Sequence, residues 1–99
     1  MEKRTPTYDL SAILDAARRK KLKVTRSAAL GAMALGIDYD GICKVVAGLS
    51  RRDFYKSMTT YADHAVWQDV YHGECQGVAL YLKFMIDEAG YLVVSFKEQ

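Results

Sequence analysis

The sequence holds few of the residues that usually mark metal sites, secreted proteins or long linkers. It has two cysteines and two histidines, and Cys43, Cys75, His64 and His72 match no metal-ligand spacing. One proline and seven glycines leave no room for a long flexible linker. We find no internal repeat and no low-complexity stretch. We therefore expect a single domain, residues 1–99, with reduced thiols and no metal or other cofactor.

Long hydrophobic runs are missing as well. The longest mainly apolar runs, such as 77–86, fall short of the roughly 18–20 residues that a membrane span needs. The charged start Met1–Lys3 has no apolar stretch behind it that is long enough for a secretory signal. The composition, with 51% hydrophobic and 26% charged residues, is that of an ordinary folded domain. We expect a cytoplasmic protein that does not contact the membrane.

Charge is divided unevenly between the two halves of the chain. Residues 1–52 hold 11 Lys and Arg against 5 Asp and Glu, and residues 53–99 hold 3 against 7. The basic excess gathers in Arg18, Arg19, Lys20, Lys21, Lys23 and Arg26. Such a cluster suits a polyanion such as RNA, but the dipole of a helix also favours cations at its end. Both interpretations stay open, because a net charge of +2 gives weak support to nucleic-acid binding.

The first half of the sequence is typical of short helices. An apolar stripe at helical spacing follows Asp9, a good N-cap, and consists of Leu10, Ile13, Leu14 and Ala17. Thr25 and Asp38 are N-caps for two further helices, and Gly36 ends the first of these two. Ser50 and Asp53 resemble a capping-box pair that opens one more turn.

The second half is typical of strands. Its alternating apolar rows are Val78, Leu80, Leu82, Phe84 and Ile86 in residues 78–86, and Leu92, Val94 and Phe96 in residues 91–97. Gly73 and Gly77 bracket an expected turn before them. Helices first and strands later predict an α+β fold in which N-terminal helices pack on an antiparallel sheet.

The register of the last hairpin follows from these rows. Facing residues share a face, so the numbers of two opposed residues must add to an even total. A three-residue loop 88–90 meets this condition, with Asp87 opposite Tyr91 and Gly90 in the left-handed position of a bulged turn. Tyr81 then lies directly across from Lys97, on the face away from the apolar row. A phenol beside an ammonium is a site-like pairing.

At this point five segments of the sequence resemble the MqsR family of bacterial toxins. They are Met1–Pro6, Asp53–Tyr61, Trp67–Tyr71, Tyr81–Lys83 and Val94–Glu98, and they keep the family's order and spacing from end to end. The resemblance implies a RelE-like fold with a curved antiparallel sheet. It also implies the toxin of a type II toxin–antitoxin system, a metal-independent endoribonuclease that cuts messenger RNA at short GC-containing sites, GCU foremost. An MqsA-like antitoxin that binds zinc and DNA would restrain it, so its contact with operator DNA would be indirect.

The resemblance also implies a set of site residues. The family's catalytic positions correspond to Lys56, Gln68, Tyr81 and Lys97, and Tyr55, Tyr61, Trp67 and Lys83 are candidates for binding the substrate. RNA breaks when its 2′-OH attacks the adjacent phosphorus, so the enzyme must move protons and stabilise charge. We expect Tyr81 to move a proton next to the charge of Lys97, Lys56 to stabilise the phosphate, and Gln68 to position the substrate. The sequence does not assign the acid and the base.

Other interpretations remain beside this one. Each site residue has an ordinary structural explanation, and a small basic domain could bind RNA or a partner protein without cutting it. A DNA-binding regulator is less well supported, because only Lys44 is positive in the helix after Gly36. The sequence departs from the family pattern in the first helix, at 72–76 and in the turn at 87–90, which bears on substrate preference.

Overall fold

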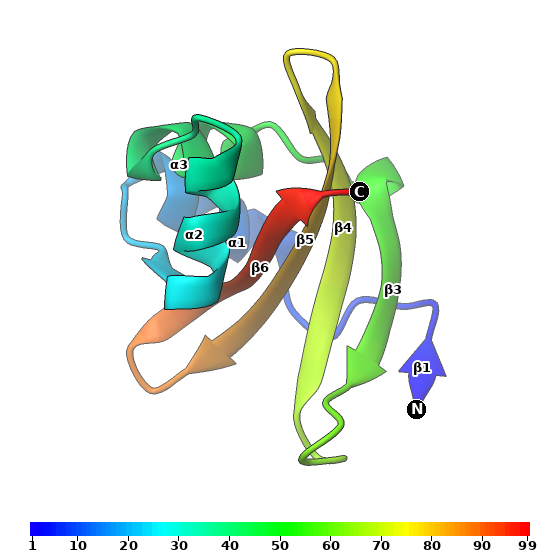
Figure 1. The fold of residues 1–99 in the computed structure, drawn as a ribbon. Coiled ribbons are helices and arrows are strands. Elements are labelled where there is room, and N and C mark those ends of the chain that lie inside the picture. Colours follow the sequence, from blue (N-terminus) through cyan, green and yellow to red (C-terminus); the bar gives the residue numbers. More distant parts are fainter.

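Three helices lie on one side of a six-stranded sheet that curves around them in the computed structural model, which describes residues 1–99 (Figure 1). The helices are α1 (Leu10–Arg18), α2 (Arg26–Ala34) and α3 (Tyr39–Ala47), followed by the 3-10 turn η1 (Arg51–Asp53). The strands are β1 (Glu2–Lys3), β2 (Lys23–Val24), β3 (Phe54–Thr59), β4 (Trp67–Cys75), β5 (Val78–Asp87) and β6 (Gly90–Glu98). The predicted α+β class is confirmed. No helix has both the length and the apolar character that crossing a membrane requires.

The sheet is mixed, which corrects the expectation of a purely antiparallel one. Its order is β1-β3-β4-β5-β6-β2, and β2 runs parallel to β6 while the other neighbours are antiparallel. The short link between α1 and α2 forms β2, because it passes along the open edge of β6 and pairs Lys23 with Leu92 and Val24 with Val93.

The predicted helix starts are confirmed by their caps. The carboxylates of Asp9 and Asp38 accept hydrogen bonds from the amides of Ser11 and Gly41, and the hydroxyl of Thr25 accepts one from Ala28. Gly36 has a φ of 73°, which lets the chain leave α2 in the left-handed region. The capping box of η1 is present as well. Local side-chain chemistry therefore sets the helix boundaries.

The turn between β5 and β6 is shorter than predicted. Asp87 faces Gly90, which leaves the two-residue turn Glu88-Ala89, and Ile86 faces Tyr91. The side chain of Asp87 accepts a hydrogen bond of 2.8 Å from the amide of Ala89, and this contact closes the tighter turn. The three-residue loop was therefore wrong.

A β-bulge at Val94 restores the predicted register further along the hairpin. Phe84 faces Val93 but Lys83 faces Ser95, so Val94 has no opposite residue. The extra residue exchanges the faces of β6, and Val93 and Phe96 are the buried ones. The predicted core row Leu92, Val94 and Phe96 is thus wrong in its first two members, while the opposition of Tyr81 and Lys97 is confirmed.

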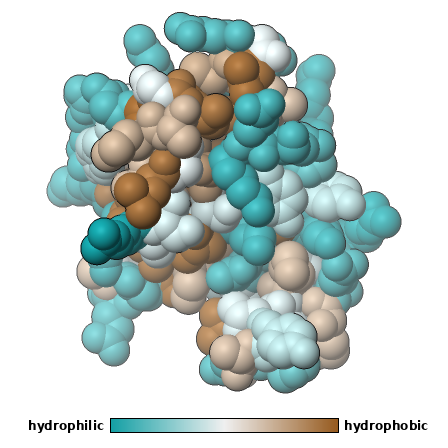
Figure 2. All heavy atoms as spheres, viewed as in Figure 1, coloured by the Kyte–Doolittle hydropathy of each residue, from teal (hydrophilic) through white to brown (hydrophobic).

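Helix α2 packs against this bulge at close range. The amide of Thr25 donates to the carbonyl of Val93, and its hydroxyl donates to the carbonyl of Val94. A side chain at Gly31 would collide with the carbonyl oxygen of Phe96, so glycine is needed where the helix crosses the strand. Figure 2 shows hydrophobic surface gathered over α2, at the left of the view, where Leu30 and Met33 are exposed.

The hairpin between β4 and β5 also differs from the expectation. Its turn is Gln76-Gly77, with φ values of 51° and 83°, which are typical of a two-residue hairpin turn. Gly73 lies inside β4 rather than at a turn. A Cβ there would touch Leu82 and Leu49, so Gly73 marks the close packing of the sheet under the end of α3.

The N-terminal segment is held to the sheet by a buried carboxylate. Asp69 is fully buried and accepts hydrogen bonds from the backbone amides of Thr7 and Tyr8 at 2.8–3.0 Å. The hydroxyl of Tyr8 donates to the carbonyl of Trp67 at 2.6 Å. These contacts place residues 1–8 against β3 and β4 and account for the unpredicted edge strand β1.

We predict that Asp69→Ala lowers the free energy of unfolding by about 2–3 kcal/mol, because the partly buried backbone amides of Thr7 and Tyr8 lose the acceptor that they share. Chemical denaturation followed by circular dichroism measures this. Asp15→Ala is the matched control, since Asp15 is exposed and forms only an i,i+4 pair with Arg19, which costs under about 0.5 kcal/mol. Equal stability of the two variants would contradict the anchoring role of Asp69.

Candidate functional site

The candidate site lies on the face of the sheet turned away from the helices, which we call the outer face. Side chains alternate along a strand, and Tyr71, Leu82 and Phe96 belong to the core on the helix side. The residues next to them along each strand therefore point outward. The predicted residues on the outer face are Tyr55, Lys56, Gln68, Tyr81, Lys83 and Lys97.

One row of the outer face runs across four strands and contains Tyr81. Tyr81 on β5 faces His72 on β4 and Lys97 on β6. The ammonium of Lys97 lies 5.4 Å from the centre of the Tyr81 ring. The ring of His72 lies 5.9 Å from that of Tyr81 and is stacked on Tyr55 at 4.4 Å. A phenol, an imidazole and an ammonium thus lie side by side.

The neighbouring row adds two further lysines. Lys56 on β3 and Lys83 on β5 both face Val70, which lies between them on β4. The ammonium of Lys83 is 5.7 Å from the Tyr81 ring, and that of Lys56 is 5.3 Å from the Tyr55 ring. Lys56, Lys83 and Lys97 are the three cations of residues 53–99. All of them gather around Tyr81.

The charges of these lysines influence one another. Burial, and then the ammonium groups of Lys97 and Lys56, lower the pKa of Lys83 below its usual value. A hydrogen bond to Glu2 on the edge strand β1 raises the pKa of Lys56, which keeps this ammonium charged. Crowded cations with one exposed carboxylate among them could hold an anion of more than one charge.

Gln68 lies on the outer face but away from Tyr81. It faces Met58 on β3 and is four residues from His72 along β4, which corresponds to about 13 Å at about 3.3 Å per residue. The row of Lys56 and Lys83 lies between the two. Gln68 is therefore separated from the groups around Tyr81.

Two of the predicted substrate-binding residues are not brought to this cluster. Trp67 faces Thr59 on the helix side of the sheet, and the ammonium of Lys3 covers its ring at 4.2 Å. Tyr61 lies in the loop between β3 and β4 and is fully exposed. The sequence alone could not show that Trp67 and Tyr81 lie on opposite faces of the sheet, because this depends on the register of β4 against its neighbours.

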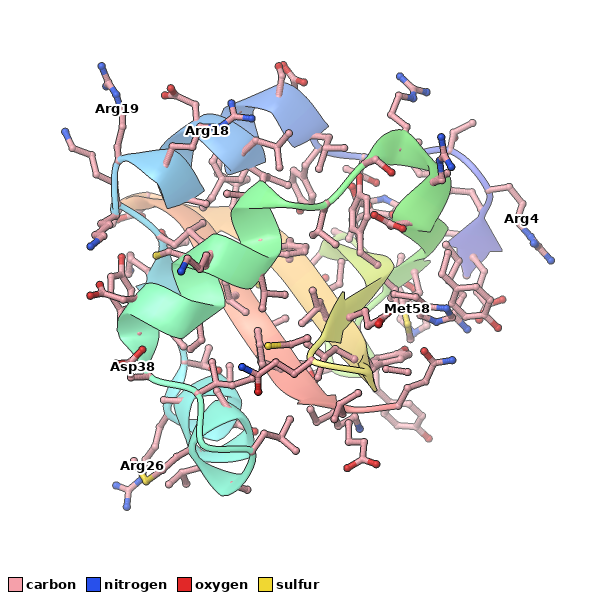
Figure 3. All side chains as sticks on the ribbon, turned by 90° about the horizontal axis from the view of Figure 1, so that it is seen from above. Arg4, Arg18, Arg19, Arg26, Asp38 and Met58 are labelled. Atoms are coloured by element: carbon pink, nitrogen blue, oxygen red, sulfur yellow. The ribbon has the colours of Figure 1, made fainter.

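The basic cluster at 18–26 also lies away from the outer face. Figure 3 shows Arg18, Arg19 and Arg26 on the left of the molecule and Met58, the partner of Gln68, on the right. Arg19 pairs with Asp15, Lys20 with Asp40, and Lys23 with Asp87 at 2.7 Å. Half of the cluster thus forms ion pairs within the chain. The cluster is therefore separate from the group of lysines around Tyr81.

His72 is the residue of this site that the sequence analysis missed. It was examined only as a possible metal ligand, and its partner in that test, His64, lies in the exposed loop before β4. The signal that could have found it is the turn Gln76-Gly77, whose two-residue length places His72 opposite Tyr81. No three His, Cys, Asp or Glu side chains lie close enough together to hold a metal ion.

Comparison with known proteins connects this geometry to one family. Residues 5–98 match the model of a family described as motility quorum-sensing regulator, toxin of MqsA. The mRNA interferase toxin MqsR of Escherichia coli (strain K12) is 50% identical over 99 residues, which cover 100% of both chains. The comparison with this relative therefore spans every position of the outer-face site.

Proposed function

This chain belongs to the MqsR toxin family, and we propose that it is an endoribonuclease that cleaves messenger RNA on the outer face of its sheet. The observation that carries the proposal is the position of Tyr81. Its ring has two ammonium groups within 6 Å, from Lys83 and Lys97, and Lys56 lies in the next row. A phosphate of RNA would find three cations and a proton-transferring phenol at one place.

The chemistry we propose is attack of the 2′-OH on the adjacent phosphorus. Such a step needs proton transfer, stabilisation of a phosphorane with extra negative charge, and alignment of the reacting groups. Lys56, Lys83 and Lys97 supply the stabilising charge, and Tyr81 takes part in proton transfer. The step requires no metal ion, and its products are a 2′,3′-cyclic phosphate and a free 5′-OH.

The remaining outer-face residues suit the neighbouring nucleotides. Gln68 has both donors and acceptors for the edge of a base or for a sugar, and the ring of Tyr55 is a surface on which a base can stack. Family membership supports cleavage at short GC-containing sites, GCU foremost. Tyr61, exposed at the end of β3, and Trp67, on the other face, would contact RNA only where it extends beyond the cluster.

We also propose that the partner of this toxin is an MqsA-like antitoxin. The description of the family as toxin of MqsA supports this. The antitoxin would be a zinc- and DNA-binding protein, so the toxin would reach operator DNA only through it. Such a pair of proteins forms a type II toxin–antitoxin system, in which binding of the antitoxin stops cleavage of messages.

The first prediction concerns the reaction itself. Purified protein incubated with a long transcript in excess EDTA should give discrete fragments with 5′-OH ends, because lysines rather than a metal ion stabilise the charge. Mapping the ends shows whether they share a GC-containing site. Binding without cutting would favour a non-catalytic RNA-binding module instead, and cleavage that vanishes with EDTA and returns with Mg²⁺ would contradict metal independence.

The second prediction concerns Tyr81 and Lys97. Tyr81→Phe keeps the ring but removes the hydroxyl, and it should lower the cleavage rate at least about 10²-fold if this group transfers a proton. Lys97→Met should weaken both RNA binding and turnover. The double variant should lose much less than the product of the single losses, because the two groups act together.

Tyr91→Phe is the matched control for Tyr81→Phe. Tyr91 packs edge-on against Tyr8 on the helix side, so the same change there should leave cleavage at the wild-type rate. Wild-type cleavage by folded Tyr81→Phe would remove Tyr81 from the proposed reaction.

The third prediction concerns growth. Expression of the chain alone should arrest a bacterial host, and co-expression of the antitoxin encoded beside it should restore growth. Lys56→Ala should relieve the arrest without the antitoxin, since a stabilising charge is lost. Lys44→Ala on α3 changes the same residue type at an exposed position and should remain toxic. Harmless accumulation of the folded wild-type protein would contradict the proposed function.

A further inference from the structure

His72 occupies a position that neither the sequence analysis nor the family resemblance assigned to the site. It is half-buried on β4, directly opposite Tyr81 in the register. Its ring is stacked on Tyr55, with an interplanar angle of 26° and 4.4 Å between the ring centres. The stack covers one face of the imidazole and fixes its plane. The two ring nitrogens lie at the edge of the ring, where they can exchange a proton with a bound group.

The proposed reaction requires one group that accepts a proton and another that donates one. Each must lie about 2.6–3.2 Å from its reacting oxygen, so the two groups must be neighbours with a phosphate between them. The rings of His72 and Tyr81 are 5.9 Å apart and tilted by 41°, which fits this condition. Imidazole is also the side chain that most readily exchanges a proton near neutral pH.

We infer that His72 is a further catalytic residue, the base that takes the proton of the 2′-OH, and that Tyr81 is the acid. This assignment rests on the proposed ribonuclease function. The bond from O2′ to phosphorus forms and the bond from phosphorus to O5′ breaks. The proton of the 2′-OH moves to a ring nitrogen of His72, and the phenolic proton of Tyr81 moves to O5′. The imidazolium then returns a proton to the phenolate, which restores both groups.

Charged or titratable groups from several elements lie around His72. They are Tyr55 and Lys56 from β3, Glu74 two residues further along β4, Tyr81 and Lys83 from β5, Lys97 from β6, and Asp53 and Lys44 beside the far end of its strand. The lysines stabilise the developing phosphorane, while the neutral ring of Tyr55 holds the imidazole in place. The four-strand row thus contains a base, an acid and a cation in consecutive positions.

The pH dependence of cleavage by the full-length protein tests the assignment. For wild type, kcat/KM should rise as the pH is raised from acidic to neutral values, because the base must be unprotonated. His72→Gln should lower kcat/KM at least about 10²-fold and remove this rising limb. Binding of an oligonucleotide with a 2′-deoxy group at the cleavage site should stay within about twofold, because the loss concerns the reaction and not the bound state.

Two further variants decide between a base and other roles. His72→Arg keeps a planar group on Tyr55 and supplies a permanent charge, but arginine does not accept a proton at these pH values, so it should be as slow as His72→Gln. His64→Gln makes the same change at the other histidine, in the exposed loop, and should match wild type. Wild-type rates with His72→Arg, or an unchanged rising limb in folded His72→Gln, would overturn the assignment of His72 alone. Absence of cleavage by wild type would instead overturn the proposed function.

Discussion

The β-bulge at Val94 is the constraint on which both faces of the sheet depend. Without it, a strand paired through the two-residue turn at 88–89 would place Lys97 one position out of register with Tyr81. With it, Val93 and Phe96 both enter the core, and Lys97 meets Tyr81 on the outer face. The carbonyls at the bulge bind Thr25, the cap of α2. One inserted residue therefore joins the docking of a helix to the alignment of the site.

Packing on the helix side also maintains an unfavourable arrangement of charge on the outer face. Three lysines lie around one phenol, and the pKa of Lys83 is lowered first by burial and then by the charges of Lys97 and Lys56. Like charges at this spacing repel, and the core formed by residues such as Phe84 and Phe96 compensates for the cost. A phosphate bound among the lysines would relieve the repulsion. This repulsion is already present in the folded protein, so its relief would contribute to the affinity of the site for RNA. Such an arrangement is electrostatic preorganisation.

The parts of the fold that local chemistry sets were predictable from the sequence, and those set by distant contacts were not. The caps at Asp9, Thr25 and Asp38 follow from residue type alone, and all were confirmed. The bulge at Val94 was missed because alternation assumes an unbroken strand, and only contact with α2 shows where it breaks. Tyr81 and Lys97 were paired correctly although the predicted turn was wrong, because the bulge adds the residue that the turn lacks. His72 and Trp67 needed the register of β4, which the apolar pattern does not contain.

The edge strand β1 shows how the N-terminal segment connects the two faces. On the helix side, Asp69 binds the amides of Thr7 and Tyr8, and this contact fixes the path of the segment along β3. On the outer face, the same path places Glu2 beside Lys56, where the two form an ion pair. Glu2 is exposed, so exchanging its carboxylate for a phosphate sacrifices little. Lys56 is therefore held in position by the carboxylate of Glu2, which the RNA of the proposed function would displace. The buried anchor at Asp69 would keep the segment that carries Glu2 in place during this exchange.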